Sequence, residues 1–209
     1  MKALDGFNSV SGYYDALKRI VFGNAILESQ LHYLPHVSRA TNILILGGGT
    51  GEMLVPLVQM NPGSRIWYVE ASSGMLAIAA KGMTARQKLN VHFIHGTQDD
   101  LPPHIFFDGI ITNFFLDLFD NRDVLAIAQN LRNRMSNGGV WLATDFVQTG
   151  VWWQRILLWA MYRFFRIACK IEANTLPSWE IQLQDAGLVR TDYQTFYSDF
   201  ISSCVFVKT

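Results

Sequence analysis

The sequence predicts an α/β fold in which a seven-stranded, mostly parallel sheet lies between layers of helices and the last strand is antiparallel. Short apolar runs alternate with segments of helical pattern along most of the 209 residues. A glycine-rich turn follows the first of these runs, at residues 47–51. The last two runs are joined by a bend too short for a parallel crossover, which needs a dozen or more residues, so these two strands are expected to be antiparallel neighbours.

Strands are expected where short β-branched, leucine-rich or aromatic runs are bounded by turn residues. Their ranges are 42–46, 66–69, 91–95, 107–112, 140–145, 190–197 and 201–208. Ser198 and Asp199 form the bend between the last two strands.

Helices are expected between the strands, with capping and breaking residues at their ends. Their ranges are 8–37, 51–60, 74–81, from 121 or 123 to the turn at 137–139, 151–170 and 178–186. Pro56 lies inside the second helix, Ser72 or Ser73 caps the third, and Gly187 stops the last. The chain, 1–209, is expected to be a single domain with an N-terminal helical cap at 1–40 and a helical insertion or lid at 151–186.

The composition argues against several classes of function. Lys plus Arg and Asp plus Glu number 17 each, so the excess positive charge of a nucleic-acid-binding protein is missing. Cys169 and Cys204 are far apart and the five histidines have no ligand spacing, so neither a disulfide scaffold nor a metal site is expected. No signal peptide and no uncharged apolar stretch of 18 residues is seen, which predicts a cytoplasmic protein.

The glycine-rich turn lies in ILILGGGTGE, residues 43–52, and suits a ligand that approaches the backbone closely. A P-loop would require Lys followed by Ser or Thr, and neither follows. The dinucleotide fingerprint would place its third glycine at Glu52, whose carboxylate would also repel a pyrophosphate. The pattern that fits is G-x-G-x-G at Gly47, Gly49 and Gly51, with a zwitterionic amino-acid moiety as the ligand.

Glu70 ends the second expected strand, about 20 residues after the glycines. A carboxylate at that place can accept hydrogen bonds from both hydroxyls of a ribose. A helix cap or a solvated loop residue is the alternative, and the glycine turn at this spacing favours the ribose interpretation.

Five segments resemble, in order, the motifs of the class I S-adenosylmethionine-dependent methyltransferases. They are ILILGGGTGEML, YVEASSGML, HGTQDDLPP, FDGIITNFF and SNGGVWLATDF. The resemblance implies a Rossmann-like three-layer sandwich, S-adenosyl-L-methionine as the cofactor, and methyl transfer to a small, hydrophobic or aromatic acceptor. The cofactor-binding residues that it implies are Gly47, Gly48, Gly49, Thr50, Gly51, Glu70, Ala71, Ser72, Met75, Thr97, Gln98 and Asn113.

Two positions depart from that family. Ile45 stands where an acid often orients the glycine turn, and Thr97, followed by Gln98, stands where an Asp usually lies beside the adenine. The opening FNSVSGYYDALKRIVFGN is similar to that of the ubiquinone and menaquinone C-methyltransferases, which implies a cofactor contact at Tyr14. The buried stripe of a packing helix explains Tyr14 equally well.

The segment 151–170 is rich in aromatic residues and carries a basic stripe. Its cations share about 80° of a helical face; they are Arg155, Arg163, Arg166 and Lys170. Such a helix suits peripheral contact with a membrane or a lid over a hydrophobic substrate. A buried helix with one solvated cationic edge is the simpler explanation and is favoured.

The sequence does not identify a catalytic residue. Methyl transfer to a phenol oxygen or an activated ring carbon needs a base, and Asp117, Asp145 and Tyr13 are candidates, although a cap, a turn or packing explains each of them better. Two other classes of function stay open. One is another Rossmann-like enzyme, either a dehydrogenase or an aminopropyl transferase, and the other is a non-catalytic S-adenosylmethionine-binding protein. The acceptor and the oligomeric state are not predicted.

Overall fold

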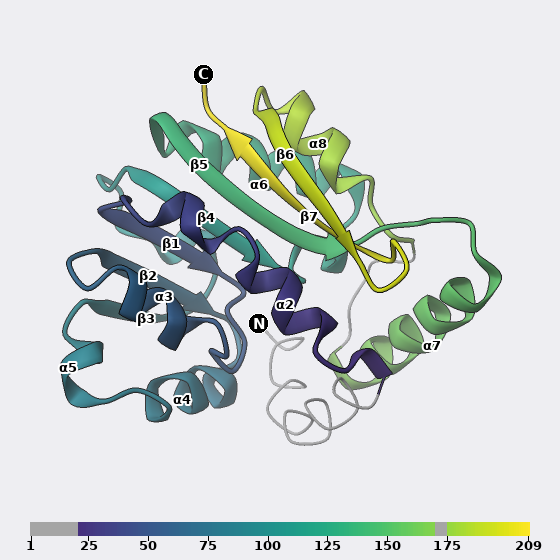
Figure 1. Ribbon diagram of the computed structural model, residues 1–209, viewed down its shortest axis with the longest axis horizontal. Coiled ribbons are helices and arrows are strands. Elements are labelled where there is room, and N and C mark those ends of the chain that lie inside the picture. The colour runs from purple at the N-terminus through teal and green to yellow at the C-terminus, as the bar shows by residue number, and fades with distance from the viewer. Residues whose placement is uncertain (1–20, 170–174) are drawn as a thin grey trace.

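The fold is described from a computed structural model, which describes residues 21–169 and 175–209. Its strands are β1 Asn42–Leu46, β2 Arg65–Glu70, β3 Val91–His95, β4 Phe107–Asn113, β5 Met135–Phe146, β6 Val189–Phe196 and β7 Ile201–Val207. They form one sheet in the order β3-β2-β1-β4-β5-β7-β6 (Figure 1). Strands β1 to β5 are parallel, and β7 runs antiparallel to both of its neighbours. The predicted fold class is confirmed.

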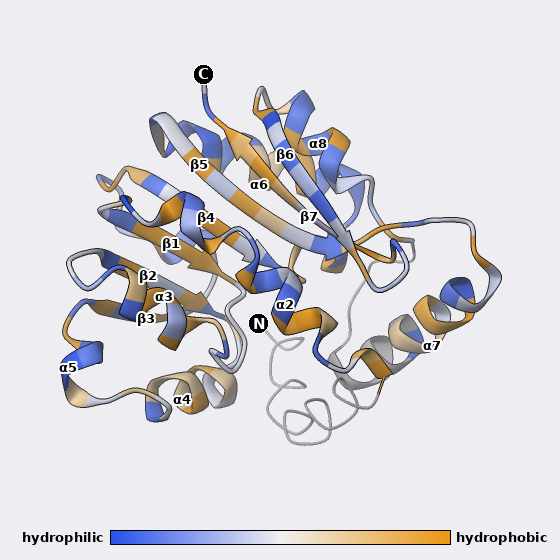
Figure 2. Ribbon diagram, in the orientation of Figure 1, coloured by the Kyte–Doolittle hydropathy of each residue, from blue (hydrophilic) through white to orange (hydrophobic). Residues whose placement is uncertain are grey.

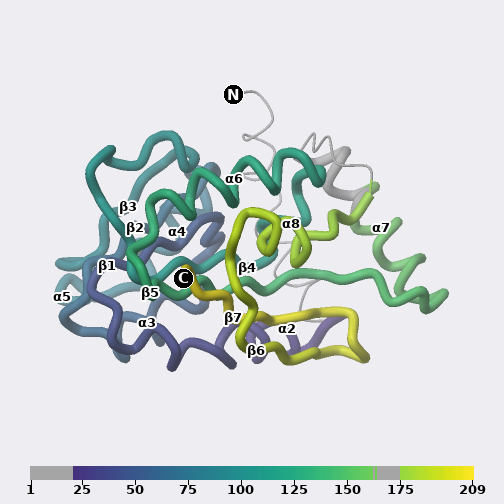
Figure 3. The backbone as a smooth tube through the Cα atoms, turned by 90° about the horizontal axis from the view of Figure 1, so that it is seen from above, coloured from purple at the N-terminus to yellow at the C-terminus, as the bar shows by residue number. Residues whose placement is uncertain are grey.

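Helices cover both faces of the sheet, as Figure 3 shows for α3 on one side and α6 on the other. The helices are α2 Ala25–Leu31, α3 Leu54–Met60, α4 Ser73–Lys81, α5 Ala85–Lys88, α6 Asn121–Asn133, α7 Trp152–Cys169 and α8 Trp179–Asp185. Three short 3-10 turns are η1 Leu34–Val37, η2 Gln98–Asp100 and η3 Leu116–Leu118. Of the predicted helix at 8–37, the structure describes α2 and η1; residues 8–20 lie outside the described part.

Alternate residues of β1 belong to two separate cores, because successive side chains of a strand point to opposite faces. Leu44 and Leu46 pack in a core that includes α6 and α8. Ile43 and Ile45 pack in a core that includes α3 and η1. Figure 2 shows the hydrophobic centre of the sheet at β1 and the more polar edge strand β6, whose side chains are mostly exposed.

Two predicted helix boundaries were wrong. Helix α3 begins at Leu54 rather than near Gly51. Pro56 is thus its third residue, in the first turn, where the missing N–H has no partner within the helix to lose. Helix α6 ends at Asn133, and the turn predicted to stop it lies inside β5. At this point the pairing of β4 with β5 changes from Phe107–Met135 directly to Gly109–Val140. The extra residues lie on β5, which therefore bulges there.

Short α5 was not predicted, although a capping box marks it. The side chain of Thr84 accepts from the backbone of Gln87, and the side chain of Gln87 accepts from the backbone of Thr84. The bend between β6 and β7 lies at the predicted place, with positive φ at Tyr197, Ser198 and Asp199.

The carboxyl ends of β1, β2 and β4 meet at one edge of the sheet. The chain winds from β1 to β2 and β3 on one side and returns to β4 on the other side of β1. A reversal of strand order of this kind leaves a crevice where ligands bind in open α/β sheets. Helix α2 lies across β7, where Ser203 Oγ donates to Ser29 O at 2.9 Å, and α7 lies at one end of the molecule (Figure 1). Within the described ranges, no helix is long and apolar enough to cross a membrane.

Candidate cofactor-binding site

A cavity of about 340 Å³ lies at the crevice between β1 and β4. Its size falls in the range of small-molecule sites. Tyr14 lies outside the described residues, so its predicted cofactor contact stays a prediction. Of the other predicted binding residues, all but Ser72 line the cavity; they are Gly47, Gly48, Gly49, Thr50, Gly51, Glu70, Ala71, Met75, Thr97, Gln98 and Asn113.

Each glycine of the G-x-G-x-G pattern has a positive φ, at +68° for Gly47, +64° for Gly49 and +83° for Gly51. A Cβ on Gly48 would lie 2.2 Å from Cζ of Tyr68, and a Cβ on Gly51 would lie 2.8 Å from Cβ of Ala79. A Cβ on Gly49 would meet no atom of the described chain within 4 Å. Gly48 and Gly51 therefore pack closely against β2 and α4, whereas Gly49 leaves open space beside the cavity.

Glu70 holds this turn in place from β2. Its Oε2 accepts from Gly49 N at 2.8 Å and its Oε1 accepts from Ser72 N at 2.7 Å. The hydroxyl of Tyr68 donates to Gly49 O at 2.9 Å. The loop-orienting acid that is missing at Ile45 is thus replaced by two groups of β2, and Ile45 itself is buried in the core. Burial raises the pKa of Glu70, and the N–H groups of Ser72 and Gly49 oppose that shift.

Ser72, the remaining predicted binding residue, is buried and does not line the cavity. Its Oγ accepts from Met75 N at 3.2 Å and so caps α4. Ser72 therefore supports Glu70 and Met75, which line the cavity.

Thr97 opens the turn η2 rather than pointing freely at a ligand. Its backbone N–H donates to Asp100 Oδ2 at 2.8 Å, and its Oγ1 accepts from Asp99 N at 3.3 Å. Asp99 lines the cavity beside Gln98. Asp99 thus supplies, two residues later, a carboxylate at the cavity that Thr97 does not supply. The two acids of GTQDD could have pointed to this residue, and the sequence interpretation did not use them.

The cavity is also lined by aromatic and other apolar side chains. They are Ile26, Phe114, Phe115, Leu118, Phe119, Phe146 and Met161. Phe114 directly follows β4 with φ of +51°, a strained conformation for a bulky residue, and its N–H donates to Thr144 O at 2.7 Å. Strained backbone of this kind is concentrated at functional sites, and nothing in the sequence around Phe114 predicted it.

Asp145, one of the predicted candidate bases, is a structural carboxylate. It is completely buried, and its Oδ2 accepts from the backbone N–H groups of Phe115, Leu116 and Asp117 at 3.1, 2.8 and 3.2 Å. Its Oδ1 accepts from Phe146 N at 2.9 Å. Asp145 therefore fixes the segment that follows β4, and it does not line the cavity.

Asp117 lines the cavity and is hydrogen-bonded to Asp145 through its carboxyl group. Burial raises the pKa of both carboxyls, that of Asp117 to about 7, and the charge of Asp117 raises the pKa of Asp145 further. The pair therefore retains a proton near neutral pH, because two adjacent buried carboxylates cannot both ionise readily. The third candidate, Tyr13, lies outside the described residues.

These groups fit the parts of S-adenosylmethionine. The open backbone at Gly49 suits the amino-acid moiety, and the Glu70 carboxylate suits a ribose diol. Met75 offers an apolar face, and the turn with Asp99 offers polar groups, to a purine. Glu52 also lines the cavity beside the glycine turn, which disfavours a pyrophosphate there. Among the side chains that the structure describes, no group of three His, Cys, Asp or Glu residues is placed to hold a metal ion.

Residues 44–141 match a family described as a methyltransferase domain. A curated relative, demethylmenaquinone methyltransferase of Geobacillus stearothermophilus, is 22% identical over 162 residues, which cover 76% of this chain and 68% of that protein.

Three solved structures share the fold: the S-adenosylmethionine-dependent methyltransferase SibL in its apo form, the mitomycin 7-O-methyltransferase MmcR, and the calicheamicin-biosynthesis methyltransferase CalO1 with S-adenosylhomocysteine bound. Their TM-scores are 0.65, 0.72 and 0.67, at 18%, 15% and 18% identity. The matches cover 93%, 99% and 99% of this chain but only 56%, 60% and 60% of those structures.

Motifs, domain match and architecture agree with one another. Residues 44–141 match a methyltransferase domain, the chain has the fold of class I S-adenosylmethionine-dependent methyltransferases, and S-adenosylmethionine is the cofactor of those enzymes.

Proposed function

We propose that this chain transfers the methyl group of S-adenosylmethionine to a small hydrophobic or aromatic acceptor. The observation that carries the proposal is that one cavity is lined both by the glycine turn with Glu70 and by aromatic side chains with Asp117. A cofactor site and an acceptor site in one cavity are what methyl transfer requires, because the two reactants must be aligned with water excluded.

S-adenosylmethionine supplies an electrophilic methyl group on its sulfonium. The glycine turn would bind its amino-acid moiety, and Glu70 would accept hydrogen bonds from its ribose hydroxyls. Thr97, Gln98 and Asp99 would face the adenine. Tyr14 is an additional predicted contact.

The acceptor would lie among Phe114, Phe119, Phe146 and Met161, which suit a flat apolar molecule. Two relatives carry names that specify small molecules of this kind, a mitomycin and demethylmenaquinone. Helix α2 and helix α7 contribute Ile26 and Met161 to the cavity, which supports the predicted roles of 1–40 as a cap and of 151–186 as a lid.

Asp117 is our candidate for the group that removes the acceptor's proton. It lines the cavity, and its own backbone N–H and those of its two preceding residues are held by Asp145. A carboxyl whose pKa lies near 7 is suited to general base catalysis at neutral pH. Asp145 acts through Asp117 and positions it.

The test is transfer of a labelled methyl group from S-adenosylmethionine to panels of phenols, quinols and aliphatic alcohols. We expect transfer to aromatic acceptors, loss of that transfer in Asp117→Asn, and no loss in Asp123→Asn, which replaces an exposed carboxylate of α6. Cofactor binding without transfer to any panel would favour a non-catalytic binding protein instead. Binding of NADH in place of S-adenosylmethionine would favour a dehydrogenase.

A further inference from the structure

Helix α7 exposes large apolar side chains that the sequence interpretation placed in a buried helix. Trp152, Ile156 and Trp159 are 72%, 57% and 65% exposed. The favoured expectation, a buried helix with a solvated cationic edge, is therefore wrong for this side of α7. Arg155 and Arg163 are exposed as well, and all five residues fall on one face because they follow each other at i, i+3, i+4, i+7 and i+11. We call this set the outer face of α7.

The opposite face of α7 anchors the helix to the domain, so the exposure of the outer face follows from a defined orientation. Trp153 packs edge-on against Tyr197, with ring centroids 5.8 Å apart. Gln154 is buried and its Nε2 donates to Ser198 O at 2.8 Å. Leu157 and Met161 pack against a buried aromatic cluster, and Met161 also lines the cavity.

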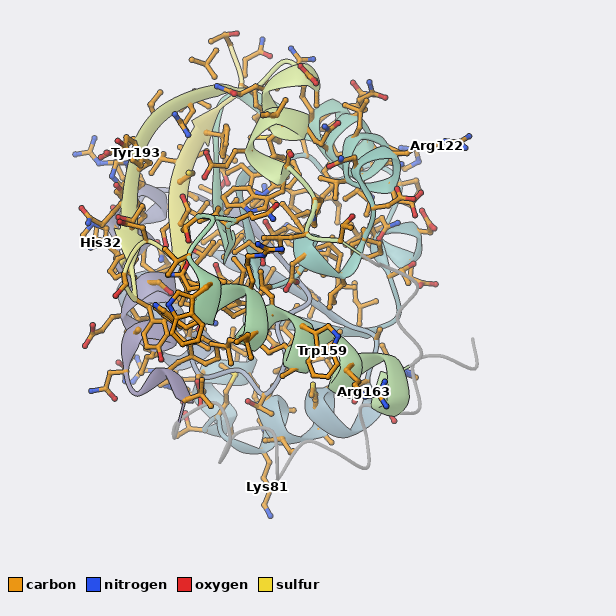
Figure 4. The ribbon with its side chains drawn as sticks, turned by 90° about the vertical axis from the view of Figure 1, so that its right-hand side faces the viewer. His32, Lys81, Arg122, Trp159, Arg163 and Tyr193 are labelled. Carbon is orange, nitrogen blue, oxygen red and sulfur yellow. The ribbon has the colours of Figure 1, made fainter. Side chains whose placement is uncertain are left out.

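Charge on the outer face is of one sign. The sequence has no Asp or Glu from residue 146 to residue 171. The guanidinium of Arg163 lies over the ring of Trp159, 5.9 Å from its centroid, so cation and aromatic group form one surface (Figure 4). Tryptophan and arginine on one face of a helix are the composition of segments that lie in the interface of an anionic bilayer.

We propose that the outer face of α7 docks onto an anionic lipid surface. A second copy of the chain fits less well, because a two-fold contact through this face would set the arginines of both copies against each other with no acid of α7 to offset them. An anionic headgroup layer neutralises Arg155 and Arg163 while the tryptophans and Ile156 enter the interface. Docking would also place α7 between the lipid and the cavity, because the opposite face of α7 contributes Met161 to the cavity. A hydrophobic acceptor that leaves the lipid would then enter the cavity past α7; this last step rests on the proposed function.

The experiment is sedimentation of the full chain with phosphatidylglycerol vesicles and with phosphatidylcholine vesicles at low salt, without cofactor or acceptor. We expect binding to the anionic vesicles that weakens as salt is added. Arg155→Gln with Arg163→Gln should lower the partition coefficient about 25-fold, since each cation near such a surface contributes about fivefold. Trp152→Ser with Trp159→Ser should lower the partition coefficient by a larger factor than the two arginine changes do.

Control variants replace an exposed cation and an exposed apolar residue elsewhere on the chain. Arg122→Gln alters an exposed cation of α6, seen away from α7 in Figure 4, and Leu89→Ser alters an apolar residue that is 79% exposed. Both should bind as the unaltered chain does, and melting curves show whether every variant is folded. The proposal is overturned if the unaltered chain ignores anionic vesicles, if the controls lose as much binding as the α7 variants, or if the tryptophan variant merely dissociates a dimer. Because no turnover is measured, these outcomes are independent of whether the chain transfers methyl groups.

Discussion

Replacing Asp117 by Asn tests the assignment of the cavity carboxyl in two independent ways, through stability and through turnover. Burial raises the pKa of Asp117 from an ordinary value of 3.8 to about 7. The folded state therefore binds a proton more tightly than the unfolded state between pH 4 and pH 7, and stability falls as the pH rises through that window. At about 1.4 kcal/mol per pKa unit, the interval from pH 5 to the pKa of about 7 corresponds to a loss of stability of about 3 kcal/mol by pH 8. This value is an upper bound, because the proton is shared with Asp145.

Asn cannot ionise, so Asp117→Asn lacks this loss. The assay is the free energy of unfolding, from urea titrations at pH 5, 6, 7 and 8. We expect the variant to gain on the unaltered chain steadily from pH 5 to pH 8, by up to about 3 kcal/mol, whereas Asp123→Asn follows the unaltered chain. Methyl transfer should be lost in Asp117→Asn at every pH. In the unaltered chain, kcat/KM should rise with pH through about 7 as Asp117 loses its proton. Parallel stability profiles for Asp117→Asn and the unaltered chain would refute the assigned burial and pairing of this carboxyl.

Three further changes test the parts that hold the site. Asp145→Ala leaves four buried backbone N–H groups without their acceptor and should lower the free energy of unfolding by about 3 kcal/mol or more, whereas a loss below 1 kcal/mol in urea titration would contradict the capping role. Gly48→Ala places a Cβ 2.2 Å from Cζ of Tyr68 and should displace the glycine turn and weaken binding of S-adenosylhomocysteine at least tenfold; Gly63→Ala, where a Cβ has open space, should leave affinity unchanged. Tyr68→Phe removes the hydrogen bond to Gly49 O and should weaken the same affinity about fivefold, for a net contribution of about 1 kcal/mol; unchanged affinity would show that Glu70 alone orients the turn.

The parts that sequence predicted are those whose signal is local. Each parallel strand is a short apolar run closed by turn residues, and β7 is reversed because the bend at 197–199 leaves no room for a crossover. The glycine turn was predictable since positive φ and a close approach to Tyr68 demand glycine at those positions. Glu70 was predictable from its place at the end of β2.

The parts that sequence missed depend on contacts between distant segments. The bulge in β5 exists because Met135 pairs with Phe107 of β4, so residues that resembled a helix stop became strand. Asp145 looked like a base candidate, and only the segment after β4 shows that its lone pairs are occupied. The outer face of α7 could not be distinguished from a buried stripe by sequence. Both faces of this helix carry aromatic residues, and only the packing partners determine which face is buried.

In the proposed function, S-adenosylmethionine lies on the glycine turn and Glu70 accepts hydrogen bonds from its ribose hydroxyls. A calorimetric cycle tests it most directly, with S-adenosylhomocysteine and its 2′,3′-dideoxy analogue titrated into the unaltered chain and into Glu70→Gln, at a temperature where melting curves show both folded. Loss of the ribose hydroxyls should weaken binding to the unaltered chain at least tenfold, since hydrogen bonds to a charged group contribute about 1.5–3 kcal/mol. In Glu70→Gln, the difference in affinity between S-adenosylhomocysteine and its dideoxy analogue should be severalfold smaller, because the carboxylate that accepts from the ribose hydroxyls is gone. An equal loss in both proteins, or no binding of S-adenosylhomocysteine to the unaltered chain, would contradict the claim.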